Sequence, residues 1–151
     1  MALQIHRATE DDAGIISTLI GEIEAYYGGD GQPGDIDQIR LLLFGAQPVA
    51  TVLLARDGGE VLGMASYTYL WPAAGASHSL YLKELFVRED GQRQGVGKAF
   101  MGELQAIARE AGCSRIEWTA DLDNPPALGF YEALGVKRHE GKVFYRVPTA
   151  P

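Results

Sequence analysis

The chain has 151 residues, 46% of them apolar and 22% charged, which are ordinary values for one soluble globular domain that buries a core. No apolar run approaches bilayer-spanning length and the N-terminus lacks a secretory pattern, so we expect a cytoplasmic protein with no membrane partner. The formal net charge of −7, with ten acidic and three basic residues in 1–75 and ten of each in 76–151, also disfavours a nucleic-acid partner.

The first half of the chain predicts a strand, two helices and a β-hairpin. Thr9 is a plausible cap for the first helix, and a glycine-rich loop follows that helix. The turn at 57–60 is typical of a hairpin, and Gly63 inside the returning strand indicates a bulge or a close backbone approach. The elements expected in this half are a strand at Leu3–Ala8, helices at 10–26 and Asp35–Phe44, and strands at Val49–Ala55 and Val61–Tyr69.

The second half predicts alternating strands and helices, followed by a terminal strand pair. Gly112 is suited to end the helix of residues 96–111, and Gly135 the helix that Asn124 caps. The expected elements are strands at Leu80–Val87 and Arg115–Thr119, helices at 96–111 and from Pro125, and strands at Val136–His139 and Lys142–Val147. The sum is one α/β domain over 1–151, with a mixed, mostly antiparallel sheet of 6–7 strands and about four helices.

The turn before the helix of residues 96–111 is rich in glycine, and such a turn can present backbone N–H groups to an anion. A Walker-type loop does not fit, because the spacing from Gly91 to Gly97-Lys98 is one residue too long and Ala99 stands where Ser or Thr is needed. A dinucleotide fingerprint does not fit either, because Phe100 occupies its third glycine position. What remains is a phosphate-binding turn at Gln92–Gly97 or a plain helix start.

Two patterns together carry a family resemblance. Gln92-Arg93-Gln94-Gly95-Val96-Gly97 resembles the Gln/Arg-x-x-Gly-x-Gly/Ala motif of the GNAT acetyltransferases, and the Asn-x-x-Ala-x-x-Phe-Tyr-x-x-x-Gly pattern at Asn124–Gly135 resembles their second signature. The resemblance implies acetyl-CoA as cofactor, a small-molecule amine as acceptor, direct acetyl transfer and a homodimer. It implies cofactor contacts at Leu85, Phe86, Val87, Gln92, Arg93, Gln94, Gly95, Val96, Gly97, Lys98, Asn124, Ala127 and Tyr131.

Two residues are candidates for the chemistry. Tyr131 matches the family's general acid, since a phenol with a pKa of about 10 stays protonated at neutral pH and can give its proton to a departing thiolate; it could instead be a packed core tyrosine. Strand alternation places Glu84 among the apolar residues Leu80, Leu82 and Phe86, where a carboxylate is costly unless it is paired or used. Glu84 is therefore a base, a cation anchor or a structural ion pair.

The acceptor is the least determined part. The loop after the first helix carries Tyr26, Tyr27 and Asp30, which we expect to border the acceptor, although the acids of this region could also form a solvated face. The resemblance is strongest to the diamine (spermidine/spermine, thialysine-type) branch, whose two consecutive acids are Lys83-Glu84 here. Polyamines, amino acids, aminoglycosides and protein amines therefore all stay open, as does a non-catalytic acyl-CoA-binding module.

The remaining reactive side chains indicate no further centre. A lone Cys113 forms no intramolecular disulfide, and we expect it to be a buried structural thiol rather than a nucleophile. His6, His78 and His139 are scattered without ligand spacing, so no metal site is expected.

Overall fold

The computed structural model describes residues 2–150. The described chain forms two compact units, one ending at Thr119 and the other beginning at Ala120. The first unit contains the whole sheet and three of the four α-helices, and the second contains the helix α4, at Pro125–Ala133, and the C-terminal segment. Within the described part of the chain, no helix combines the length and the apolar character that crossing a bilayer requires.

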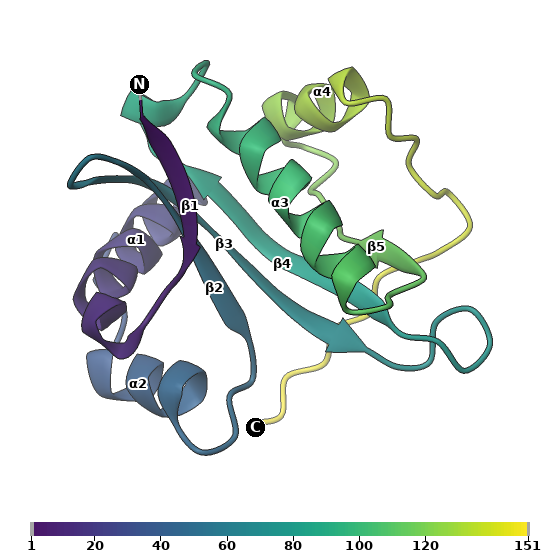
Figure 1. Cartoon of the computed structure of the whole chain (residues 1–151), viewed down its shortest axis with the longest axis horizontal. Helices are drawn as coiled ribbons and strands as arrows, with labels where there is room; N and C mark the ends of the chain where they lie inside the picture. The colour runs from purple at the N-terminus through teal and green to yellow at the C-terminus, as the bar shows by residue number, and fades with distance from the viewer. Residues whose placement is uncertain (1, 151) are drawn as a thin grey trace. The chain divides into compact units, whose positions relative to one another are not determined.

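The sheet of the first unit has five strands in the order β1-β2-β3-β4-β5, with antiparallel pairing except between β4 and β5 (Figure 1). It is mixed and mostly antiparallel, as expected. The strands are β1 (Leu3–Arg7), β2 (Thr51–Asp57), β3 (Glu60–Leu70), β4 (Ser79–Val87) and β5 (Arg115–Glu117). The helices of this unit are α1 (Ala13–Tyr26), α2 (Ile36–Phe44) and α3 (Val96–Glu110), with short 3-10 helices η1 (Glu10–Asp12) and η2 (Glu89–Gly91).

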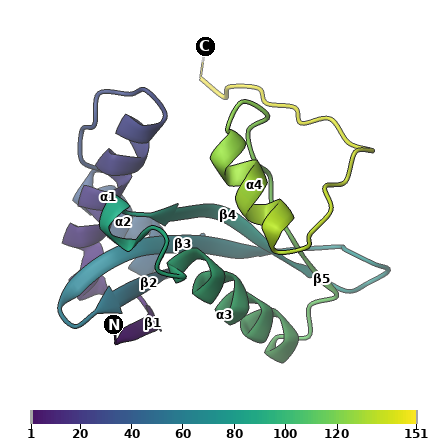
Figure 2. The same cartoon turned by 90° about the horizontal axis from the view of Figure 1, so that it is seen from above.

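Helices cover both faces of this sheet (Figures 1 and 2). The helices α1 and α2 pack on the face that carries alternate apolar residues of β2 and β3, and this core includes Ile16, Leu19, Ile39, Val52, Leu54 and Met64. The helix α3 packs on the other face with Phe100 and Leu104 fully buried. Val96, Met101 and Ala108 of the same helix are also buried.

A close approach of two backbones fixes the end of β4. A Cβ on Gly63 would collide with the carbonyl oxygen of Phe86 and lie 3.1 Å from the Cα of Val87, so only glycine fits there. The pairing of β2 with β3 also shifts beside Gly63, between Ala55 and Arg56. The expected bulge and close approach are both confirmed, and they set β3 directly against the part of β4 that leads to the glycine-rich turn.

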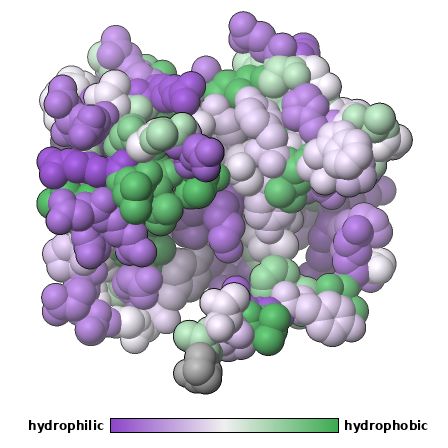
Figure 3. All heavy atoms as spheres, turned by 90° about the horizontal axis from the view of Figure 1, so that it is seen from below, coloured by the Kyte–Doolittle hydropathy of each residue, from purple (hydrophilic) through white to green (hydrophobic). Residues whose placement is uncertain are grey.

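The expectation of 6–7 strands is wrong, because the described residues form five. The segments Val136–His139 and Lys142–Val147 are irregular backbone, and the side chains of Phe144 and Tyr145 are 62% and 87% exposed. Alternating apolar residues favour a strand only when a neighbouring strand receives their backbone hydrogen bonds, and local sequence does not specify that partner. On the face that Figure 3 shows, apolar side chains form separate patches among polar ones.

The second unit begins as the sequence predicts. The side chain of Asn124 accepts a hydrogen bond from the N–H of Ala127 at 3.4 Å, and Pro125 starts α4. Gly135 follows the helix in the left-handed conformation with φ +82°, which fits its expected role as the residue that ends it.

Candidate active site

The turn between β4 and α3 has the geometry of an anion-binding loop. Arg93 and Gly95 both adopt left-handed backbone conformations, with φ +64° and +79°. Gly95 is the N-cap of α3 and provides no capping side chain, and the first turn of the helix contains no acidic residue. The first N–H groups of α3 therefore lie at the positive end of the helix dipole without a carboxylate of that turn to satisfy them.

In α2 and α4, unlike in α3, a side chain caps the N-terminus of the helix. The carboxylate of Asp35 accepts a hydrogen bond from the N–H of Gln38 at 3.1 Å and so caps α2, and Asn124 caps α4 in the same way. At α3 this place is held by a glycine. An anionic ligand can take the role that a side chain has in the other two helices.

Side chains of the turn hold it in shape from within. The amide of Gln92 donates to the carbonyl of Val87 at 3.3 Å, and the amide of Gln94 donates to the carbonyl of Asp90. Gly91 lies so close to β3 that a Cβ on it would be 3.1 Å from the Cβ of Leu62. The N–H of Gln92 donates to Glu89 at 3.2 Å, so the N–H groups available to an anion come from later in the turn.

The strand before the turn has a partly open edge. Among the residues that the structure describes, β5 pairs with β4 only from Ser79 to Tyr81, because β5 ends at Glu117 (Figure 1). Leu85, Phe86 and Val87 lie in β4 beyond this pairing and are half-buried. Backbone groups at an open strand edge can pair with an extended ligand that carries amides.

A bulge in β4 changes the surroundings expected for Glu84. Ser66 pairs with Glu84 and Tyr67 with Leu82, so Lys83 is an extra residue of β4. Because Ser66 and Tyr67 point to opposite faces, Glu84 does not share a face with Leu80 and Leu82, as alternation had predicted. It lies with Phe86 on the face that α1 covers, half-buried, whereas Lys83 is exposed.

A cavity of about 450 Å³ lies between α1 and the end of β4. Its volume is within the range of small-molecule sites. Tyr26 packs edge-on against Phe86 with ring centroids 6.5 Å apart, and Tyr27 packs in the same manner on Tyr26 at 5.1 Å. The lining residues are Glu22, Ala25, Tyr26, Phe86, Val87, Arg88, Glu89 and Gln92.

The predicted acceptor residues are thus only partly brought together. Tyr26 lines the cavity and Tyr27 packs on it, but Glu84 and Asp30 are not among the lining residues. Asp30 accepts a hydrogen bond from the N–H of Gln32 at 3.1 Å and shapes its own loop. Asp35, from the same region, has a structural role because it caps α2, whereas Asp37 is 97% exposed.

The sequence alone did not identify Arg88. Its guanidinium donates to both carboxylate oxygens of Glu22, at 2.9 Å and 2.6 Å. This hydrogen-bonded pair raises the pKa of Arg88 above its ordinary value, so the side chain stays charged. The available signal was a single cation between the end of a strand and a phosphate-type turn, but its partner is 66 residues away in the sequence.

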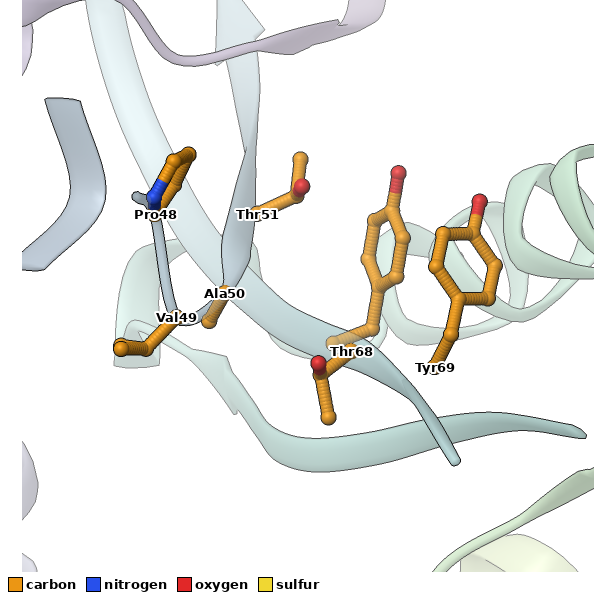
Figure 4. Close-up of a pocket in the computed structure, with 7 residues that line it drawn as sticks. Pro48, Val49, Ala50, Thr51, Thr68 and Tyr69 are labelled. Atoms are coloured by element: carbon orange, nitrogen blue, oxygen red, sulfur yellow. The ribbon is translucent and has the colours of Figure 1, made fainter. Parts of the chain in front are cut away.

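A second, smaller hollow of about 120 Å³ lies at the opposite end of the sheet (Figure 4). It is formed by the start of β2 and the end of β3, where Thr68 and Tyr69 project to opposite faces. Burial, and Tyr67 beside it, raise the pKa of Tyr69. The hollow is smaller than typical ligand sites, and the end of β3 pairs with the start of β4, away from the glycine-rich turn.

The other predicted site residues belong to the second unit. Asn124 caps α4, and Ala127 and Tyr131 are half-buried on it. The ring of Tyr131 packs edge-on against Phe130 with centroids 5.1 Å apart. Among the described residues of α4, none is fully buried.

This chain is similar to a known protein family, to named relatives and to solved structures. The family described as Acetyltransferase (GNAT) family matches residues 16–136. The thialysine N-epsilon-acetyltransferase of Bos taurus is 29% identical over 145 residues, covering 89% of this chain and 84% of that protein. The aminoglycoside N(6')-acetyltransferase type 1 of Stenotrophomonas maltophilia is 27% identical over 105 residues, covering 68% and 69%. Among solved structures, an integron cassette protein from the mobile metagenome of V. cholerae superimposes with a TM-score of 0.83 at 33% identity, covering 98% of this chain and 93% of that one.

Proposed function

This chain belongs to the GNAT acetyltransferase family, and from that premise we propose that it transfers the acetyl group of acetyl-CoA directly to the primary amine of a small cationic acceptor. The observation that carries the proposal is the N-terminus of α3. It has no capping side chain and no acid in its first turn, and it follows a turn with two left-handed residues at the open end of β4.

The described residues fit coenzyme A. Its pyrophosphate is an anion that suits the N–H groups at the start of α3, from Gly95 to Lys98. Arg93 and Lys98 are exposed and can add positive charge there. Its pantetheine arm contains amides that suit the open edge of β4 at Leu85–Val87. We assign Asn124 and Ala127, on α4, to the same arm by family resemblance.

Acetyl-CoA supplies an activated thioester. Residues of this chain accept the proton that the amine loses and donate the proton that the leaving thiolate takes up. A primary ammonium, with a pKa of about 10.4, must lose a proton before its nitrogen can attack. Glu84 takes that proton through water, or anchors the cation. Tyr131 holds the proton that the thiol leaving group requires when the new C–N bond has formed and the C–S bond breaks.

A small amine is the acceptor class that the cavity favours. Its walls combine the rings of Tyr26 and Phe86 with the Glu22–Arg88 ion pair and with Glu89, which leaves one carboxylate in excess. Aromatic faces and a carboxylate both suit a cation. The names of the relatives, thialysine and aminoglycoside acetyltransferases, point to acceptors of the same kind. From the family resemblance we also propose a cytoplasmic homodimer.

Thiol release from acetyl-CoA, measured over a panel of amines, tests this function. The panel contains spermidine, lysine, thialysine, kanamycin and a peptide with a free N-terminus, and mass spectrometry identifies each product. We expect thiol release with at least one small amine and loss of turnover in Tyr131→Phe. Release only with the peptide would indicate a protein acetyltransferase. Coenzyme A binding without release from any amine would indicate a non-catalytic module.

A further inference from the structure

Arg88 connects three parts of the first unit at the entrance to the glycine-rich turn. Its backbone N–H donates to the carbonyl of Leu62 at 2.8 Å, and its Nη1 donates to the carbonyl of Val61 at 3.1 Å. Its Nε and Nη2 donate to Glu22 on α1. The residue that starts the turn is thereby fixed to β3 by backbone and side chain, and to α1 by a two-pronged ion pair.

Glu22 transmits this connection to the wall of the cavity. Ala25 and Tyr26 follow it by three and four residues, which places all three side chains on one face of α1. Each of the three lines the cavity, as do Arg88 and Gln92. One ion pair therefore joins the helix that carries Tyr26 to the turn in which Gln92 holds the carbonyl of Val87.

The geometry of the pair suits positioning more than stability. The two side chains are 26% and 36% exposed, and ion pairs with such exposure contribute little to the free energy of unfolding. Two parallel N–H···O bonds nevertheless fix the direction of a guanidinium, which a lysine in its place could not reproduce.

We infer that Glu22 and Arg88 are positioning residues. They fix the glycine-rich turn at Gln92–Gly97 relative to the face of α1 that carries Tyr26. This inference rests on the proposed function. When the pair is broken, the end of η2 and the turn after it lose their connection to α1. Coenzyme A then binds to a turn that must first be ordered, and its affinity falls.

The test measures coenzyme A affinity by calorimetry and the melting temperature by circular dichroism, in four variants. Glu22→Gln removes the negative charge and keeps the shape of the side chain. Arg88→Lys keeps the positive charge but removes the two parallel N–H donors of the guanidinium. The third variant combines both substitutions. Asp12→Asn is the matched control, because Asp12 pairs with Arg56 at 2.9 Å with 14% and 26% exposure, away from the cavity.

We expect the dissociation constant of coenzyme A to rise about tenfold in Glu22→Gln and somewhat less in Arg88→Lys, with melting temperatures no lower than that of the control. The double variant should bind no more weakly than the worse single variant, because both changes break one interaction. The KM for the amine should rise in the same variants.

Three results separate the possibilities. Wild-type affinity in Glu22→Gln and Arg88→Lys, in a wild-type protein that binds coenzyme A, would overturn this inference and leave the proposed function standing. An equal loss in Asp12→Asn would reduce the effect to general destabilisation and also overturn it. A wild-type protein that does not bind coenzyme A would overturn the proposed function itself, and the inference with it.

Discussion

Replacing Gly95 by alanine tests whether the shape of the turn matters for binding. Gly95 has φ +79°, and a Cβ added there would meet no heavy atom within 4 Å, so the change introduces backbone strain without a collision. A left-handed conformation costs an L-residue about 1–2 kcal/mol. The chain either keeps this conformation and loses that much stability, or relaxes it and moves the N–H groups that follow.

Gly112→Ala is the matched control at the other end of the same helix. Gly112 has φ +78° with equally open surroundings, and a helix of 15 residues separates the two glycines by about 22 Å. Both variants should lose about 1 kcal/mol, which lowers the melting temperature by about 2–4 °C. Only Gly95→Ala should also weaken coenzyme A binding, by at least about tenfold in calorimetry. Equal affinities in the two variants would refute the role of this turn.

Four further changes have defined outcomes. Phe100→Ala removes a side chain with 0% exposure and should cost about 3–5 kcal/mol in urea unfolding, whereas a loss below about 1 kcal/mol would contradict its central place in the core. Asp35→Ala removes the cap of α2 and should cost about 1 kcal/mol in the same assay without changing coenzyme A affinity. Burial raises the pKa of the Cys113 thiol, so its alkylation by iodoacetamide should reach half its maximal rate at a higher pH in the folded than in the unfolded chain. The contribution of the Cys113 thiol to the free energy of unfolding is therefore complete below the pKa it has in the unfolded chain, and it is lost as the pH rises through the pKa it has in the folded chain. Coincident alkylation profiles of the folded and unfolded chains would contradict this. Glu84→Gln should lower turnover while leaving coenzyme A affinity within about twofold, and unchanged turnover would remove Glu84 from proton transfer.

Local chemistry made most of the elements predictable. Gly112 and Gly135 are left-handed at helix ends, Asn124 caps α4, and Gly58 turns the β2–β3 hairpin with φ +61°. Each depends on residues close in the sequence. The irregular backbone of the described C-terminal segment could not be predicted in this way. A strand exists only with a partner, and the alternation of Lys142–Val147 does not say which partner it would have.

In the candidate site too, features with a local sequence signal could be predicted, and features that depend on distant contacts could not. The turn at Gln92–Gly97 could be found from its residues, because a glycine-rich helix start has a local signature. The face of Glu84 was predicted wrongly, because one extra residue at Lys83 reverses the alternation and the sequence does not mark it. Arg88 and Glu22 were missed as a pair because their contact exists only in the folded chain. Cys113, expected to be buried, is in fact half-buried.

The most direct test of the central claim is a pair of calorimetric titrations, one with coenzyme A and one with pantetheine. Pantetheine keeps the thiol arm and lacks the pyrophosphate. If the N–H groups at the start of α3 bind the pyrophosphate, coenzyme A should bind measurably and pantetheine at least about a hundredfold more weakly, a difference of ~2.7 kcal/mol. Equal affinities for the two ligands, or no heat with coenzyme A, would contradict the account.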